Sequence, residues 1–104
     1  MTFTSHHWSD DEGCPLGGTT FGTGFAISWQ HGPLGRDADR VEPNGAFVET
    51  LIEAVMDRLE HYQGSKFATE YNEGALSSLG VALDFLRRRT SDREDRGVEG
   101  TLVE

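Results

Sequence analysis

The sequence has few cysteines, few basic residues and no long hydrophobic run. Its one cysteine, Cys14, among 104 residues excludes an intramolecular disulfide and a cysteine-based zinc site. Its 18 acidic and 9 basic residues give a net charge of −9, so it lacks the basic face that binds DNA or an anionic membrane. No apolar run reaches the roughly 20 residues of a membrane span, and no signal peptide is visible. We therefore expect a cytoplasmic protein whose partners include neither DNA nor a membrane.

Common catalytic motifs are absent as well. The sequence contains no Gly-x-Ser-x-Gly, no His-Glu-x-x-His and no phosphate-binding loop. Its carboxylates are scattered, and the pair His6 and His7 near a few acids is only a weak metal signal. We predict no catalytic residue, no metal site and no cofactor.

The N-terminal part of the chain carries one clear pattern. Residues 1–24 are rich in Gly, Thr and acidic residues without any periodicity, which predicts a flexible arm. Residues 25–30 alternate between apolar and polar side chains, which predicts a half-buried strand. This strand needs a partner, which residues 19–23, the segment 101–103 or another subunit could supply. A charged linker follows, so we group residues 25–43 as strand and linker.

Residues 44–97 have the pattern of two helices. Asn44 is a suitable N-cap for a first helix that ends at Gly64. Thr69 or Asn72 can cap a second helix that stops at Gly97. The short connector favours an antiparallel hairpin. The predicted fold is α+β and mostly α, with the hairpin after a short β region and residues 98–104 as a tail.

The apolar stripes of the hairpin are too wide for one hairpin and one strand to cover. Eight apolar side chains follow a helical spacing in the first helix alone: Phe47, Val48, Leu51, Ile52, Val55, Met56, Leu59 and Tyr62. A chain of this length buries only a thin core. We therefore expect a homo-oligomer.

The one basic stretch lies at the end of the second helix. Residues 87–96 contain five arginines and three acids, and the apolar seam of the helix continues into Arg89 and Arg93. These arginines form either an anion site or a charged helix end near the C-terminal dipole.

The connector offers Phe67, Tyr71 and Asn72, about 30 Å away along one helix. These residues could share a pocket with the arginines only across a subunit interface. The alternatives are core packing for the two aromatic residues and capping for Asn72.

Residues 44–90 resemble the helical-hairpin domain of the phage anti-CBASS and anti-Thoeris sponge proteins. The resemblance rests on the segments Asn44-Gly-Ala-Phe-Val-Glu-Thr, Leu59-Glu-His-Tyr-Gln, Lys66-Phe-Ala and Asn72-Glu-Gly-Ala-Leu-Ser-Ser-Leu-Gly-Val-Ala-Leu-Asp-Phe-Leu. The strand before the hairpin is more similar to the anti-Thoeris branch.

The resemblance implies an immune-evasion protein in the host cytoplasm. Such a homo-oligomer, commonly a hexamer, holds cyclic ADP-ribose isomers or cyclic oligonucleotides at subunit interfaces without cleaving them. The positions it implies for ligand binding are Phe67, Asn72, Arg89 and Arg93. The alternative hypothesis is an acidic interaction module that docks a basic host protein.

Overall fold

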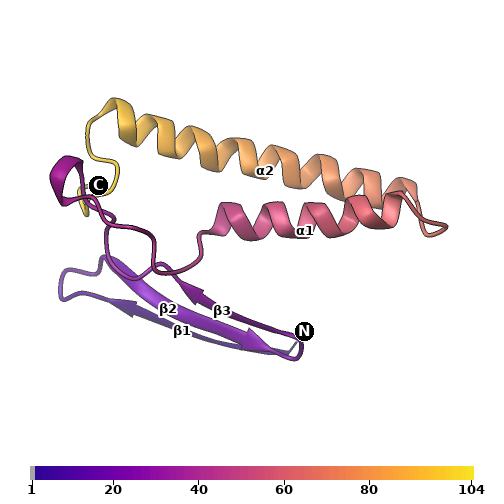
Figure 1. Cartoon of the computed structure of the whole chain (residues 1–104), viewed down its shortest axis with the longest axis horizontal. Helices are drawn as coiled ribbons and strands as arrows, with labels where there is room; N and C mark the ends of the chain where they lie inside the picture. The colour runs from indigo at the N-terminus through magenta and orange to yellow at the C-terminus, as the bar shows by residue number, and fades with distance from the viewer. Residues whose placement is uncertain (1) are drawn as a thin grey trace. The chain divides into compact units, whose positions relative to one another are not determined.

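Residues 2–104, which the computed structural model describes, form two units (Figure 1). The first, which we call the sheet unit, comprises the chain up to Phe47 together with Glu94–Glu104. The second, the hairpin unit, comprises Val48–Arg93. The α+β class with a β region before two helices is thus as predicted.

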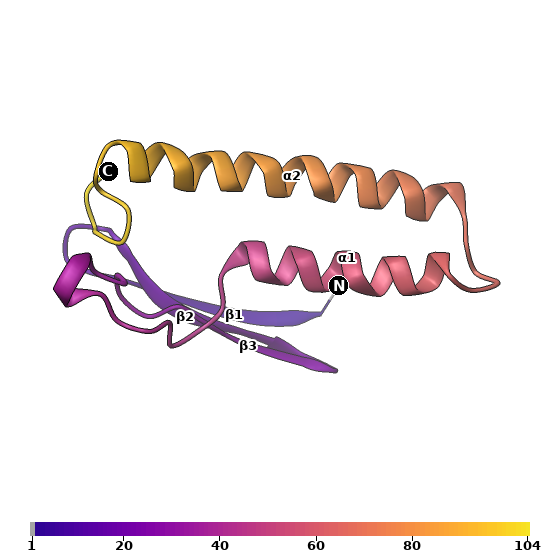
Figure 2. The same ribbon diagram turned by 45° about the horizontal axis from the view of Figure 1, so that its top comes forward.

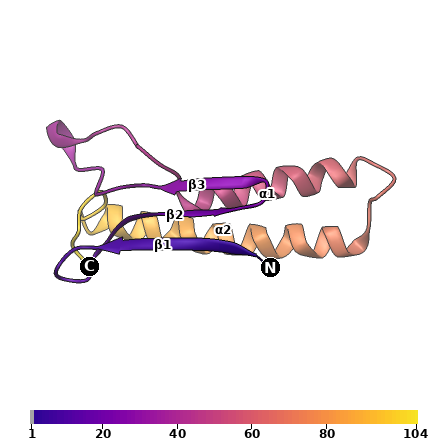
Figure 3. The same ribbon diagram turned by 90° about the horizontal axis from the view of Figure 1, so that it is seen from below.

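The sheet unit is built on a three-stranded antiparallel sheet. Its strands are β1 (Phe3–Ser9), β2 (Pro15–Gly22) and β3 (Phe25–Trp29), and β2 is central (Figure 3). The strand predicted over residues 25–30 is confirmed as β3, and its partner is β2. A chain of polar contacts crosses the sheet, because the Thr20 hydroxyl lies 2.8 Å from both Ser5 Oγ and the indole nitrogen of Trp29.

The prediction of a flexible arm over residues 1–24 is wrong, because this segment contains β1 and β2. Its glycines serve close packing. A side chain at Gly18 would collide with the carbonyl oxygen of His6 on the neighbouring strand. At Gly22 an added Cβ would lie 2.8 Å from the ring of Phe25. Glycine-rich segments are often flexible. In this segment, however, the missing side chains let a neighbouring strand pack against Gly18 and an aromatic ring pack against Gly22.

Asn44 does not cap the first helix, which corrects a second expectation. Its side chain instead brackets the backbone of His31: Oδ1 accepts from the His31 amide at 2.8 Å, and Nδ2 donates to the His31 carbonyl at 3.0 Å. Beyond it, Ala46 pairs with the end of β3 at Trp29. These contacts favour an extended backbone at residues 44–46, so the helix begins only at Val48.

The hairpin unit consists of two antiparallel helices, α1 (Val48–Gln63) and α2, which lie side by side (Figures 1 and 2). Helix α2 runs over Glu70–Asp95, so its last residues reach into the sheet unit. It ends just before Gly97, whose φ of 73° suits the predicted stop. Neither helix has the length and apolar character needed to cross a bilayer, and the structure describes no other helix that does.

Little of the hairpin's apolar surface is buried. Leu83, which is 5% exposed, is the only buried hydrophobic side chain among residues 2–104. Val55 on α1 and Val81 and Phe85 on α2 are 51%, 55% and 63% exposed. An ion pair of 3.2 Å between Arg87 and Glu53 also joins the two helices. Other stripe residues, such as Leu51, Ile52 and Leu79, are half-buried. One hairpin alone therefore covers its apolar stripes only in part.

Candidate ligand-binding site

The turn of the hairpin is closed by one side chain, that of Gln63. Its Oε1 accepts hydrogen bonds from the Thr69 backbone amide at 3.0 Å and from Asn72 Nδ2 at 2.9 Å. Its Nε2 donates to the Thr69 carbonyl at 3.0 Å and to Glu73 Oε1 at 2.9 Å. We call these four bonds the Gln63 clasp. They fix the connector between the two helices although it is exposed to solvent.

Asn72 is held by this clasp and does not cap the helix. The Thr69 hydroxyl accepts from the Asn72 backbone amide at 3.1 Å, so Thr69 is the N-cap of α2. The Asn72 side chain donates to Gln63 and, at 3.2 Å, to the carbonyl of Phe67. The capping alternative for Asn72 is thereby excluded.

The aromatic side chains of the connector are not packed in a core. Phe67 is 65% exposed and Tyr71 is 81% exposed. The ammonium group of Lys66 lies 5.4 Å from the centre of the Phe67 ring. An exposed ring beside an ordered amide is the kind of surface on which a planar base stacks.

Arg87 and Arg88 of α2 form ion pairs, whereas Arg89 forms none with the residues that the structure describes. Arg88 forms an ion pair of 3.4 Å with Asp84, as its spacing predicts, and Arg87 pairs with Glu53. Arg89 is exposed and makes no hydrogen bond or ion pair with residues 2–104. Arg93 is half-buried in the same helix. Arg89 thus has a guanidinium available for an anion.

One chain does not bring the predicted site residues together. Phe67 and Asn72 lie at the tip of the hairpin, whereas Arg89 and Arg93 lie toward the other end of the continuous helix α2. At 1.5 Å per residue, Asn72 is about 30 Å from Arg93, as expected from the sequence. A site that contains all four residues requires a second chain.

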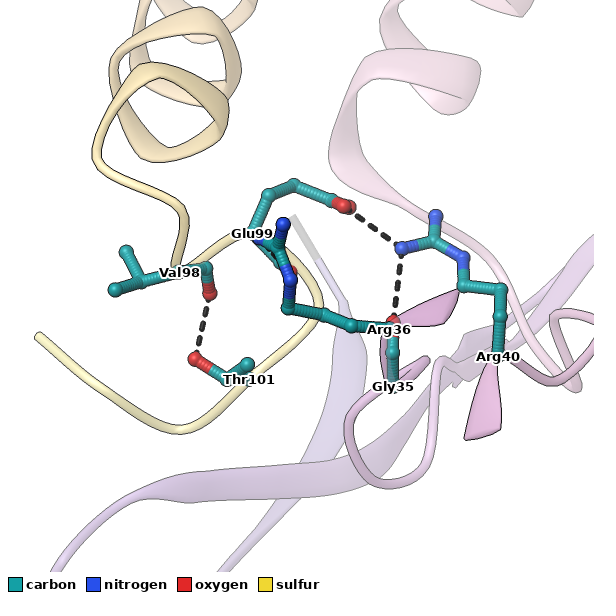
Figure 4. A network of polar contacts seen from close by, with 6 residues as sticks. All are labelled: Gly35, Arg36, Arg40, Val98, Glu99 and Thr101. Carbon is teal, nitrogen blue, oxygen red and sulfur yellow. Dashed lines mark hydrogen bonds and ion pairs between the residues drawn. The ribbon is translucent and has the colours of Figure 1, made fainter. Parts of the chain in front are cut away.

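A further polar cluster lies in the sheet unit and was not predicted. An open cleft of about 200 Å³ is lined by Arg36, Asp37, Arg40, Glu94 and Glu99. Arg40 forms a 2.7 Å ion pair with Glu99 and donates to the carbonyl of Gly35 (Figure 4). The hydrogen bond with Glu99 raises the pKa of Arg40.

Two basic and three acidic residues line this cleft, and an ion pair joins Arg40 to Glu99 while Arg36 donates to the Glu99 carbonyl. These contacts tie the tail to the loop before the 3₁₀ turn η1 (Asp37–Asp39), where the Gly35 amide also donates to the Gly100 carbonyl. The cleft therefore has a structural role that its residues explain.

The thiol of Cys14 is not activated as a nucleophile. Partial burial raises the pKa of its thiol, and the charges of Asp10 and Glu12 raise it further. The thiol therefore stays protonated and unreactive at neutral pH. Within residues 2–104, no group of three or more His, Cys, Asp and Glu side chains is arranged to hold a metal ion.

A comparison of sequences finds similarity to a phage anti-defence protein. The chain is 40% identical over 75 residues to Thoeris anti-defense 1 of Bacillus phage SBSphiJ7, a match over 72% of this chain. It belongs to the anti-Thoeris family, which confirms the resemblance predicted from its sequence. The chain spans about half the length of this relative, since the match covers 50% of it. No protein-family model matches the chain.

Proposed function

We propose that the protein serves phage immune evasion by sequestering a cyclic nucleotide second messenger without cleaving it. The ligand is a cyclic ADP-ribose isomer or a cyclic oligonucleotide, held between subunits of a homo-oligomer, for which the family resemblance implies a hexamer. The relative's name, Thoeris anti-defense 1, supports the immune-evasion role. The observation that carries the ligand assignment is the exposed side chain of Phe67 together with the ordered amide of Asn72, which donates to the Phe67 backbone carbonyl.

An antiparallel pair of α2 helices would complete such a site. If two copies of α2 pack antiparallel with their symmetry axis near Val81, the tip of one copy meets the arginines of the other. Asn72 lies nine residues before Val81, and Arg89 and Arg93 lie eight and twelve residues after it. Val81 and Phe85 are exposed apolar residues at this midpoint, so the pairing would also cover apolar surface. It would create two equivalent sites, in which Phe67 stacks on a base and the arginines bind phosphate.

The test is recovery of intact ligand from purified protein. The protein is incubated with cyclic ADP-ribose isomers and with cyclic di- and trinucleotides, separated from free ligand and then heated. We expect at least one ligand to be released intact, and native mass spectrometry to show an oligomer. Failure of every such ligand to bind, recovery of cleaved products only, or a strict monomer would contradict the proposal.

Two neighbouring arginines provide a matched pair of variants. Arg89→Gln removes a guanidinium that has no partner within the described chain, whereas Arg88→Gln removes one that is paired with Asp84. Both change the net charge equally. We expect Arg89→Gln to weaken binding at least tenfold, since a charged hydrogen bond contributes about 1.5–3 kcal/mol. Arg88→Gln should leave binding nearly unchanged. Equal effects of the two variants would show that the site reads only overall charge.

A further inference from the structure

The Gln63 clasp determines which atom of Asn72 faces outward. The backbone of Thr69 sets the orientation of the Gln63 amide, because a backbone N–H can only donate and a carbonyl can only accept. Gln63 Oε1 must therefore face the Thr69 amide, and Nε2 must face the Thr69 carbonyl. The acceptor Glu73 lies on the Nε2 side, which agrees with this orientation.

The same logic continues to Asn72. Its amide group meets Gln63 Oε1 at 2.9 Å and the Phe67 carbonyl at 3.2 Å, and both of these atoms are acceptors. Only the NH₂ group of Asn72 can satisfy them, and it uses both of its protons to do so. Asn72 Oδ1 accepts no hydrogen bond from residues 2–104. The Asn72 atom that the tip leaves available is thus a fixed acceptor.

We propose that Gln63 is a positioning residue that makes Asn72 read a hydrogen-bond donor on the ligand, an inference that rests on the function proposed above. The donor is the amino group of a base such as adenine, or a ribose hydroxyl. A base that presents a carbonyl at this place would set two acceptors against each other and leave both unsatisfied. The clasp therefore determines specificity through an amide that it orients before the ligand arrives.

The positioning claim is tested on the full-length protein without any ligand. Nuclear magnetic resonance measures the exchange of the two Asn72 side-chain amide protons with water. In the unchanged protein both protons are hydrogen-bonded, so we expect slow exchange. Gln63→Ala should accelerate it severalfold, while the helical circular dichroism and the oligomer mass stay unchanged. An exchange rate that does not respond to Gln63→Ala would overturn the positioning role, whether or not any ligand binds.

The specificity claim is tested with cyclic ADP-ribose and two analogues. One analogue carries hypoxanthine in place of adenine, and the other lacks a ribose hydroxyl. We expect one of the two to bind roughly tenfold more weakly than cyclic ADP-ribose, and the affected analogue identifies the donor. Gln63→Ala should remove this discrimination. Equal binding of all three probes would overturn the specificity claim, whereas absence of any binding would count against the proposed function and leave the exchange result standing.

A rescue pair separates positioning from general stability. Gln63→Glu keeps an acceptor for the Thr69 amide and for Asn72. It sets a carboxylate against both the Thr69 carbonyl and Glu73, to which the replaced amide donated at 3.0 and 2.9 Å. We expect it to weaken binding and to accelerate Asn72 exchange. Adding Glu73→Gln restores a donor opposite that carboxylate but not a donor for the Thr69 carbonyl, so it should recover both properties in part. No recovery in the double variant would contradict the clasp as the cause.

Discussion

The sheet unit and the hairpin unit are each stabilised internally by different kinds of contact. In the sheet unit the backbone itself packs closely, at Gly18 against the neighbouring strand and at Gly22 beneath an aromatic ring. In the hairpin unit, Leu83 is the one buried hydrophobic side chain that the structure describes, and the Gln63 clasp closes the far end. The sheet unit thus depends on glycines, which have no side chain, and the hairpin unit depends on the side chains of Leu83 and Gln63.

The residues that we propose to bind the ligand lie in the hairpin unit and not in the sheet unit. The exposed aromatic rings of the connector and the available Arg89 all belong to the hairpin unit, whose own core is minimal. A hairpin that leaves apolar side chains such as Val55, Val81 and Phe85 exposed gains from association. The sheet unit already satisfies its backbone through strand pairing and the bracket around His31.

Gly18→Ala should have the largest effect, on the sheet unit. The added methyl group collides with a backbone carbonyl that cannot move away without breaking the β1–β2 ladder. We expect a loss of about 3 kcal/mol in the free energy of unfolding. Both tryptophans of the chain, Trp8 and Trp29, lie in the sheet unit, so urea unfolding followed by tryptophan fluorescence reports on it. A stability equal to that of the unchanged protein would show that the glycine is not required for packing.

Leu83→Ala should have the next largest effect, on the hairpin unit. It removes the one buried hydrophobic side chain that the structure describes, and the cost of such a cavity is about 2–3 kcal/mol where neighbours relax partly. Circular dichroism at the helical band measures the loss. As the matched control, Leu102→Ala removes a leucine that is 45% exposed in the sheet unit and should leave this transition nearly unchanged. Similar losses in both variants would contradict the assignment of the hairpin's stability to Leu83.

Gly74→Ala should have the smallest effect, with the opposite sign. Gly74 lies within α2, and a Cβ there would meet nothing within 4 Å. Replacing a helical glycine by alanine then stabilises the helix by about 0.5–1 kcal/mol. The same substitution thus has opposite signs in the two units. If thermal unfolding shows a destabilised hairpin, the glycine serves a close contact with another chain.

The sequence predicts the elements whose patterns are local. β3 and the two helices follow from apolar spacing that one segment carries by itself. β1 and β2 could not be predicted in this way, because their glycines and threonines show no alternation and their pairing joins residues up to 19 positions apart. Asn44 resembles a helix cap locally, but its partner His31 is 13 residues away.

In the candidate site, too, features that depend on a local pattern could be predicted and features that depend on distant residues could not. The separation of Asn72 from the arginines follows from the hairpin pattern. The exposure of Phe67 does not, because the sequence left core packing of this ring open. The role of Gln63 does not follow from the pattern either, since its bonds reach residues six, nine and ten positions along the chain. The ion pair of Arg40 spans 59 positions, so no local signal distinguishes it from an ordinary charged linker.

The hairpin is an insertion within the sheet unit, because the chain leaves that unit after Phe47 and returns to it at Glu94. Equal lengthening of both helices would change the reach of the tip and leave the sequence of the sheet unit untouched. Seven residues added to each helix would carry Phe67 and Asn72 about 10 Å further from the hairpin's base. The reach of the hairpin can therefore change by whole helical turns without any change in the sheet unit.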